Sequence, residues 1–254
     1  MKKLFKTILL ITLTCLFMTA CSSNNTPSNA SSDDAKNILI AVSPDYPPYE
    51  SLTTSNEIEG FDVDMVEWLF NYINSQGYNY TYEWKQMSFD TIISAIQTDQ
   101  VDLGVSGFTY DPERKVLFSN PYFKSAEVAL VNSNSDINTL EDLKGKSIGA
   151  QMGTTGETCA NEIEGATVMA IEDMGICIQT LISGGVDAVI ADLAVANNYA
   201  ANGDFKVLDE MLLDEDNYII AKQGNDELMN IINEAIDAFK ASDDYNALAE
   251  KWGL

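Results

Sequence analysis

The residue with the most specific chemistry in this sequence is Arg114, the one arginine among 14 basic residues. It comes shortly after a β-rich run at residues 101–105. Asp111 and Pro112 are typical of the N-cap and the first residue of a helix, so we expect Arg114 in the first helical turn. A guanidinium at an already positive helix end indicates an anion site, because its planar fork suits a carboxylate. The alternative is a structural salt bridge with one of the 39 acidic residues.

Two other polar groups follow predicted strands. Gly153-Thr154-Thr155-Gly156 comes after the run 147–152 and opens a predicted helix, so its N–H groups and hydroxyls can bind an anion; a plain turn is the alternative. Asp192 ends the run 186–191, where its carboxylate can receive an ammonium or cap the next helix. Together these groups suit the zwitterion of an α-amino acid. The guanidinium and the N–H groups can bind its carboxylate, and the Asp192 carboxylate can bind its ammonium.

The elements that must position these groups alternate between short β-rich runs and helical runs. A first βαβαβ set has strands at 38–42, 78–84 and 101–105 and helices at 61–72 and 89–96. A second set has strands at 147–152, 167–171 and 186–191 and helices at 155–163, 174–182 and 193–201. Extended stretches at 127–132 and 218–223 follow the two sets, and helices at 226–240 and 243–251 close the chain.

This order predicts an α/β fold of two lobes, each a mostly parallel sheet flanked by helices, joined by two hinge strands. We expect lobe 1 at 37–127 plus 224–254, the hinge strands at 128–133 and 217–223, and lobe 2 at 134–216. Ligands of open α/β sheets bind beyond the carboxyl ends of the strands, which for two facing lobes is the cleft between them.

Composition narrows the function classes. The chain has 254 residues and no histidine, which removes the Ser/His/Asp and Cys/His triads and every histidine-bearing zinc site. A formal net charge of −25 would repel a phosphate backbone, so we expect no nucleic-acid partner. No pattern indicates a catalytic residue, a cofactor or a metal, and Asp214-Glu215-Asp216 is interpreted as a solvated loop rather than a calcium site.

The N-terminal segment is typical of an exported chain. Lys2, Lys3 and Lys6 precede an apolar stretch at 8–17, as in a secretory signal peptide over 1–20. Met18-Thr19-Ala20-Cys21 resembles the lipobox of bacterial lipoproteins, which implies diacylation of Cys21, with acyl chains such as palmitate, and anchoring at the outer face of the cell membrane. Residues 21–36 read as a flexible tether. Cys159 and Cys177 remain in the folded part, either as a disulfide or as free thiols.

From residue 38 to the end, the chain resembles family 3 extracellular solute-binding proteins, the amino-acid receptors of ABC importers, with the type II periplasmic-binding fold. The motifs that carry the resemblance are Asp45-Tyr46-Pro47-Pro48-Tyr49, Glu59-Gly60-Phe61-Asp62-Val63-Asp64, residues 106–114 with Phe118-Ser119-Asn120-Pro121-Tyr122, Leu140-Glu141-Asp142-Leu143-Lys144-Gly145-Lys146, Gly153-Thr154-Thr155, residues 186–192 and Lys251-Trp252-Gly253.

The resemblance implies a role for ten residues. Arg114 would bind the ligand α-carboxylate with Thr109, Thr154 and Thr155, while Asp192 and the Gly107 carbonyl, in the Ser106-Gly107 segment, would bind the α-ammonium. Tyr46 and Phe89 match the aromatic positions on either side of the ligand side chain, and Gln151 matches a position that touches its end. The ligand-binding residues expected are therefore Tyr46, Phe89, Ser106, Gly107, Thr109, Arg114, Gln151, Thr154, Thr155 and Asp192.

Two positions depart from the family pattern. Ser43 stands where many basic- and glutamine-binding relatives have Asp, so a contact to the ligand side chain is missing or is supplied otherwise, for example by Asp45. Asp111 replaces the usual Thr, which keeps a capping role but adds a negative charge near Arg114 that weakens its pull on an anion.

The function implied is that of a monomeric, membrane-anchored receptor that closes around a polar or basic amino acid and delivers it to the permease subunits of an ABC importer. Glutamate and aspartate fit less well, because the cleft offers no second arginine. The alternatives are an enzyme similar to cyclohexadienyl dehydratase on the same fold, which would need a general acid such as Asp111, and the ligand-sensing domain of a signalling receptor.

Overall fold

The computed structural model describes residues 35–254. The predicted signal peptide, Cys21 and all but the end of the predicted tether lie outside the described residues; Lys36 already begins the first strand. The strands are β1 (Lys36–Val42), β2 (Asp45–Tyr46), β3 (Glu50–Leu52), β4 (Ile58–Glu59), β5 (Tyr80–Gln86), β6 (Leu103–Thr109), β7 (Leu117–Phe118), β8 (Phe123–Asn132), β9 (Ser147–Gln151), β10 (Thr167–Ile171), β11 (Ala188–Asp192) and β12 (Phe205–Ala221). The helices are α1 (Phe61–Ser75), α2 (Phe89–Gln97), the 3₁₀ helix η1 (Leu140–Leu143), α3 (Thr155–Glu162), α4 (Met174–Ile182), α5 (Leu193–Asn202), α6 (Asp226–Lys240) and α7 (Asp243–Trp252).

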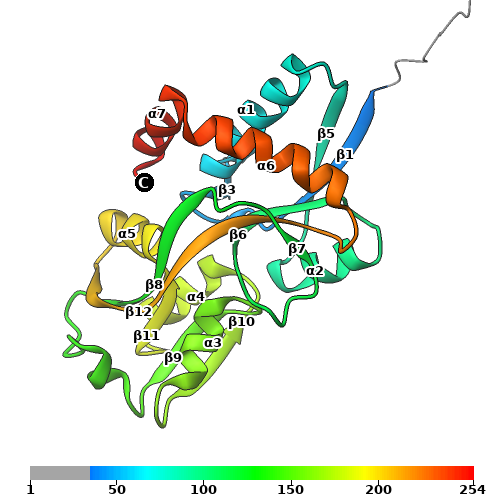
Figure 1. Ribbon diagram of the computed structural model, residues 1–254. Helices are drawn as coiled ribbons and strands as arrows, with labels where there is room; N and C mark the ends of the chain where they lie inside the picture. Colours follow the sequence, from blue (N-terminus) through cyan, green and yellow to red (C-terminus); the bar gives the residue numbers. More distant parts are fainter. Residues whose placement is uncertain (1–34) are drawn as a thin grey trace, which may run out of the picture. The chain divides into compact units, whose positions relative to one another are not determined.

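One mixed sheet runs through the described residues in the order β10-β9-β11-β8-β12-β6-β1-β5. At one end β1 pairs in parallel with β5 and β6, and at the other β9 pairs in parallel with β10 and β11. Between them β8 and β12 pair with each other and with their outer neighbours in antiparallel fashion. Figure 1 shows β8 and β12 side by side, leading from the β9–β11 end to the β1 and β6 end.

The two central strands are longer than their hydrophobic runs indicate. β8 begins at Phe123, and β12 begins at Phe205 rather than near residue 217. They pair from Phe205 opposite Asn132 to Asn217 opposite Phe123, with register shifts on the way. Six of the thirteen residues at 205–217 are apolar, but they do not alternate regularly with polar ones, so hydrophobicity alone does not mark the segment as a strand. The pairing with β8 is the reason that it is extended.

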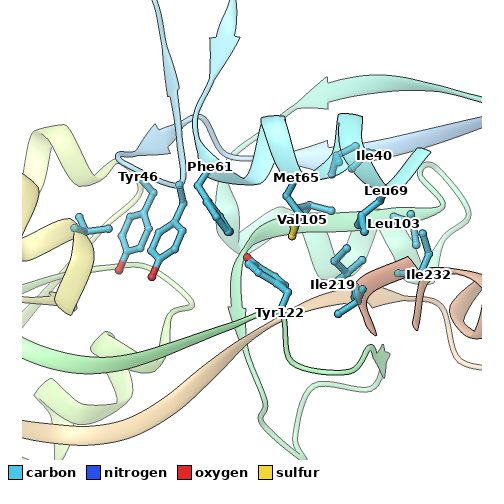
Figure 2. Close-up of a cluster of buried hydrophobic side chains, with 14 of the residues drawn as sticks. Ile40, Tyr46, Phe61, Met65, Leu69, Leu103, Val105, Tyr122, Ile219 and Ile232 are labelled. Atoms are coloured by element: carbon cyan, nitrogen blue, oxygen red, sulfur yellow. The ribbon is translucent and has the colours of Figure 1, made fainter. Parts of the chain in front are cut away.

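The packing around α1 illustrates why the predicted helices form. Met65 and Leu69 are spaced by one helical turn and are fully buried, so they project from the same face of α1. Figure 2 shows this face against Leu103 and Val105 of β6 and Ile232 of α6. The bounds predicted for the helices at 174–182 and 226–240 match α4 and α6, since both segments have clear helical periodicity.

The C-terminal helices pack next to α1 (Figure 1). The indole Nε1 of Trp252 and the Nζ of Lys251 both donate to Asp64 of α1, each at 2.6 Å. No helix between residues 35 and 254 has the length and the apolar composition needed to cross a lipid bilayer. Cys159 and Cys177 are free and buried in different core clusters, which decides between the two alternatives that the sequence left open.

Candidate functional site

A pocket lies at the ends of β6, β9 and β11, next to the paired strands β8 and β12. All ten residues predicted to bind a ligand line it. The lining residues are Asp45, Tyr46, Phe89, Ser106, Gly107, Thr109, Arg114, Glu127, Gln151, Thr154, Thr155, Asp192 and Glu215. The cavity that they enclose has a volume of only about 10 Å³. In this conformation the pocket therefore has room for about one water molecule.

Arg114 reaches this pocket from a turn after β6. Its Nη1 donates to the carbonyl of Thr109 at 2.8 Å and its Nη2 to the carbonyl of Gly153 at 2.9 Å. The guanidinium also lies over the rings of Phe89 and Phe108, with Cζ 5.7 and 5.5 Å from the centroids. Among the described residues it forms no ion pair within 4.0 Å. The structural salt bridge considered for Arg114 is thus not formed, and the charge stays available to an anion.

The helix predicted to begin at Asp111 is wrong. Asp111 accepts from the backbone N–H of Glu113 at 2.8 Å, and the N–H of Arg114 donates to the Asp111 carbonyl at 3.1 Å, which makes a single turn. The chain must be extended again at β7, where Leu117 and Phe118 pair with β12, so no second helical turn fits. Burial lowers the pKa of Arg114, and the charge of Asp111, followed by those of Glu215 and Glu127, raises it.

Asp192 has the capping role considered for it and also lies at the pocket. It is the N-cap of α5, accepting from the N–H of Ala194 at 3.0 Å, and it lines the pocket. The hydroxyls of Tyr49, at 3.1 Å, and of Ser125 also donate to its carboxylate. Burial raises the pKa of Asp192, and these hydrogen bonds oppose the rise. A buried carboxylate with several donors is a prepared partner for an ammonium group.

The Gly153-Thr154-Thr155-Gly156 segment opens α3 as predicted. Thr154 is the N-cap and its hydroxyl oxygen accepts from the N–H of Glu157 at 3.2 Å. Gly153 has φ +81, which favours glycine, and its carbonyl accepts from Arg114. Thr155, the first residue of α3, is buried against two acidic side chains. The pocket therefore has a helix N-terminus and two threonines on the side facing Arg114.

The aromatic and amide residues form the rest of the predicted set. Phe89 stacks on Phe108 with ring centroids 4.5 Å apart, and the Tyr46 hydroxyl accepts from the N–H of Asp192 at 3.0 Å. Gln151 donates through Nε2 to Asp45 at 2.8 Å. Asp45 also accepts from the hydroxyl of Ser43, so Ser43 orients this carboxylate at the pocket wall. Asp45, the residue considered as the substitute for the missing acid at position 43, therefore lines the pocket.

Two fully buried acids, Glu50 and Asp62, accept hydrogen bonds from Ser106 and Gly107. Ser106 donates its hydroxyl to Glu50 at 2.7 Å, and the N–H of Gly107 donates to Asp62 at 3.4 Å. Neither Glu50 Oε2 nor Asp62 Oδ1 has a hydrogen-bond partner among the described groups, so two ionised carboxylates would be unsatisfied there. Burial and the charge of Asp62 raise the pKa of Glu50 well above its usual value, and burial raises the pKa of Asp62 to about 7. The pair therefore holds a proton at neutral pH.

This buried pair predicts a pH-dependent stability. Because the pKa of Asp62 is raised from 3.8 to about 7 in the folded protein, its contribution is fully present below the unfolded value and is lost as the pH rises through about 7. Asp62→Asn, neutral at every pH, should remove this part of the decline in unfolding free energy, on the order of a few kcal/mol. Urea unfolding at a series of pH values measures it. Asp209→Asn at an exposed position is the control, and equal slopes for both variants would contradict the expectation.

Sequence reasoning missed Glu127 and Glu215. Glu127 lies on β8 opposite Asp192 of β11, and Glu215 lies on β12, two residues before Asn217 on the same buried face. Both line the pocket, and the solvated loop expected at 214–216 is wrong for Glu215, which is only 6% exposed. In the structure, buried Glu215, Asn217 and Ile219 alternate with more exposed neighbours, as on a strand, but two of the three are polar, so no alternation of hydrophobicity in the sequence could have marked them.

The comparisons with known proteins agree on one family. Residues 38–254 match the family described as bacterial extracellular solute-binding proteins, family 3. A probable histidine-binding protein of Campylobacter jejuni is 30% identical over 262 aligned positions, which cover 100% of this chain and 100% of that protein. The arginine-binding extracellular protein ArtP of Bacillus subtilis is 31% identical, with 97% of each chain covered.

Solved structures show the same fold. An ancestral arginine-binding protein bound to arginine has a TM-score of 0.79 and 32% identity, covering 85% of this chain and 97% of that one. ArtJ of Geobacillus stearothermophilus, described as arginine-, lysine-, histidine-binding, has a TM-score of 0.79 and 32% identity, covering 85% and 95%. The predicted α/β fold class is confirmed, and these relatives are binding proteins rather than enzymes. The chain belongs to the bacterial extracellular solute-binding proteins of family 3.

Proposed function

We propose that this protein binds an α-amino acid with a cationic side chain, of the arginine and histidine class, and passes it to an ABC importer. The observation that carries the proposal is that Arg114, free of any ion pair in the described chain, and Asp192 line the same small pocket. A guanidinium and a buried carboxylate facing one space complement the two charged groups of an amino-acid backbone.

The charges of the pocket favour a cationic side chain. Asp45, Glu127, Asp192 and Glu215 line it together with one basic residue, Arg114. Asp45 and Gln151, hydrogen-bonded to each other, would contact the end of the side chain, and the rings of Tyr46 and Phe89 would flank it. Aromatic faces attract a guanidinium or an imidazolium as well as apolar groups. The names of the relatives, which bind arginine or histidine, support the same class.

The mechanism that we propose is closure of two lobes. Residues 37–127 with 224–254 would form one lobe and residues 134–216 the other, with β8 and β12 as the hinge. Arg114 and Asp192 come from opposite lobes in this division, so a ligand bridging them binds the closed form more tightly and shifts the population toward it. The closed surface would then be recognised by the permease subunits, and diacylated Cys21 would hold the monomer at the outer face of the membrane.

A thermal-shift screen tests the ligand class. L-Arginine, L-histidine and L-lysine are expected to raise the melting temperature, because a ligand that binds only the folded state stabilises it in proportion to the logarithm of its concentration over Kd. L-Glutamate, which lacks a cationic side chain, should not. Agmatine, which is arginine without the carboxylate, reports whether the α-carboxylate is needed. Stabilisation by glutamate alone, or equal stabilisation by agmatine and arginine, would contradict the proposal.

A further inference from the structure

The hydroxyl of Thr155 lies between two carboxyl groups in the pocket wall. Its Oγ1 is 2.9 Å from Glu127 Oε1 and 3.1 Å from Glu215 Oε2. A threonine hydroxyl has one proton to donate and otherwise accepts. It can give a full hydrogen bond to only one of these carboxyl groups, so the other contact requires that the carboxyl group itself carries a proton and donates it to Thr155.

No ion pair in the described part of the chain stabilises both carboxyl groups in the ionised form, which would make the shared proton unnecessary. Neither Glu127 nor Glu215 belongs to an ion pair in the described part of the chain, and Oε2 of the almost fully buried Glu127 has no hydrogen-bond partner there. Arg114 attracts both charges but directs its Nη1 and Nη2 to backbone carbonyls. If both were ionised, Glu127 would keep the Gly156 N–H and Glu215 would keep Thr109 as hydrogen-bond donors, but one of the two contacts of Thr155 Oγ1 would join two oxygens with no proton between them.

The other titratable groups that face the pair come from four elements. Asp192 of β11 lies opposite Glu127 in the register of β8 and adds a negative charge. Tyr46 of β2 and Cys159 of α3 also face the two acids, and burial raises the pKa of both, so they are neutral near pH 7. Arg114, in the turn after β6, is the one positive group. Burial raises the pKa of Glu127 well above its usual value and that of Glu215 to about 7, in agreement with the hydrogen-bond geometry.

The donors that Glu215 uses are those needed by a ligand. Glu215 bonds to Thr155 and also to Thr109, and both threonines line the pocket with Arg114. A ligand α-carboxylate at Arg114 would join Asp111, Glu215 and Glu127, whose charges already act on this guanidinium. If the pair keeps a proton, one of these four acidic groups is neutral and can donate a hydrogen bond; if the pair loses it, four anions share one cation.

We propose that Glu127 and Glu215 hold one proton through the Thr155 hydroxyl, and that a ligand α-carboxylate binds at Arg114 only while this proton is kept. The proposal rests on the amino-acid binding function proposed above. The proposal predicts that the affinity for the ligand depends on pH, because binding is coupled to proton uptake. The bound carboxylate favours the protonated pair, so above the pH at which the free pair loses its proton, each ligand bound takes up to one proton from solution, and the affinity falls by up to tenfold per pH unit.

Isothermal titration calorimetry with L-arginine tests this directly. Titrations between about pH 6 and about pH 8, in pairs of buffers with different ionisation enthalpies, give the number of protons exchanged on binding. We expect uptake close to zero at the low end and approaching one proton at the high end, with Kd rising in parallel. Binding heat with no proton exchange throughout, or with proton release, would overturn the proposal while leaving the binding function intact.

Variants locate the proton. Glu215→Gln places a neutral amide beside Thr155 and should bind L-arginine with a Kd that no longer changes between about pH 6 and about pH 8, and with no proton uptake. Glu234→Gln, the same chemical change on the exposed face of α6, should retain the wild-type pH dependence. A Glu215→Gln variant that still takes up a proton would show that another group is responsible, and would overturn the assignment.

A ligand-free measurement keeps the two proposals separate. If neither L-arginine nor L-histidine gives any heat, the proposed function fails. The proton can then still be tested from the infrared band of protonated carboxyl groups at neutral pH, which should be weaker in Glu215→Gln than in Glu234→Gln. An equal band in the two variants would overturn the shared proton without reference to any ligand.

Discussion

Replacing Arg114 with alanine is expected to weaken the binding of L-arginine by about 30-fold or more. Arg114 is the only basic residue lining the pocket in the described chain, and it would be the partner of the ligand α-carboxylate. Truncating one side of a desolvated charge pair costs about 2–5 kcal/mol, and each 1.4 kcal/mol is about tenfold in Kd. The surrounding Asp192, Glu127 and Glu215 would then act on the carboxylate without compensation.

The loss should be specific to binding. Arg114 is only partly buried, and its removal leaves two backbone carbonyls, those of Thr109 and Gly153, without one donor each. We therefore expect the ligand-free protein to lose only about 1 kcal/mol of unfolding free energy. Arg114→Lys keeps the charge but not the fork, and should also lose most of the affinity. Calorimetry with L-arginine measures both variants.

Lys115→Ala is the matched control, since Lys115 is an exposed neighbour whose Nζ donates to the carbonyl of Pro112 in the same turn. It should bind L-arginine as the wild type does. If Arg114→Ala and Lys115→Ala bound L-arginine equally well, Arg114 would not be the carboxylate partner, and the proposed orientation of the ligand would be wrong.

Gly60→Ala is expected to destabilise the folded protein severely. Gly60 precedes α1 with φ +144, and a Cβ there would lie 2.0 Å from the carbonyl oxygen and 2.5 Å from the carbonyl carbon of Tyr49. These are backbone atoms, which cannot move aside by a change of rotamer. The N–H of Asp62 donates to the same Tyr49 carbonyl at 3.0 Å, so the contact also positions the start of α1. Displacing it disturbs the fully buried Tyr49, Glu50 and Phe61 together.

The loss should exceed about 4 kcal/mol, a large part of the 5–15 kcal/mol typical of a folded protein. Gly77→Ala is the control that has the backbone strain of a positive φ without the steric clash. Gly77 has φ +98, but a Cβ there meets nothing within 4 Å. It should cost about 1–2 kcal/mol. Urea unfolding followed by circular dichroism compares the two. Similar midpoints for both variants would mean that the backbone near Tyr49 relaxes freely, contrary to the expectation.

Much of the fold was predictable because its elements have clear periodicities. The helix over 226–240 has apolar residues at helical spacing, and the strand over 167–171 is followed at once by the N-cap segment of the next helix, so the bounds of α6 and β10 agree with the prediction. Gln151 and Asp192 end the parallel strands β9 and β11, and Ser106 lies near the end of β6, which runs in the opposite sense, so the carboxyl ends of the two sets of strands face one pocket.

The errors come from features that depend on tertiary contacts. The turn at Asp111 has the residues of a helix start, but the pairing of β7 with β12 a few residues later leaves no room for the helix. Glu215 is charged and sits between two aspartates, so its hydropathy indicates solvent, while the pairing of β12 with β8 buries it. The partners of Asp192 are also invisible in the sequence, since Tyr49 is 143 positions away.

The pocket described above is narrower than any amino acid that it is proposed to accept. Several hydrogen bonds already join its walls, including those from Arg114 to Gly153, from Tyr49 to Asp192 and from Gln151 to Asp45. A ligand can enter only when these hydrogen bonds are broken. Its apparent affinity is therefore the intrinsic affinity reduced by the fraction of molecules in which they are broken. Selectivity among amino acids then depends on how far each one replaces the bonds that its entry breaks.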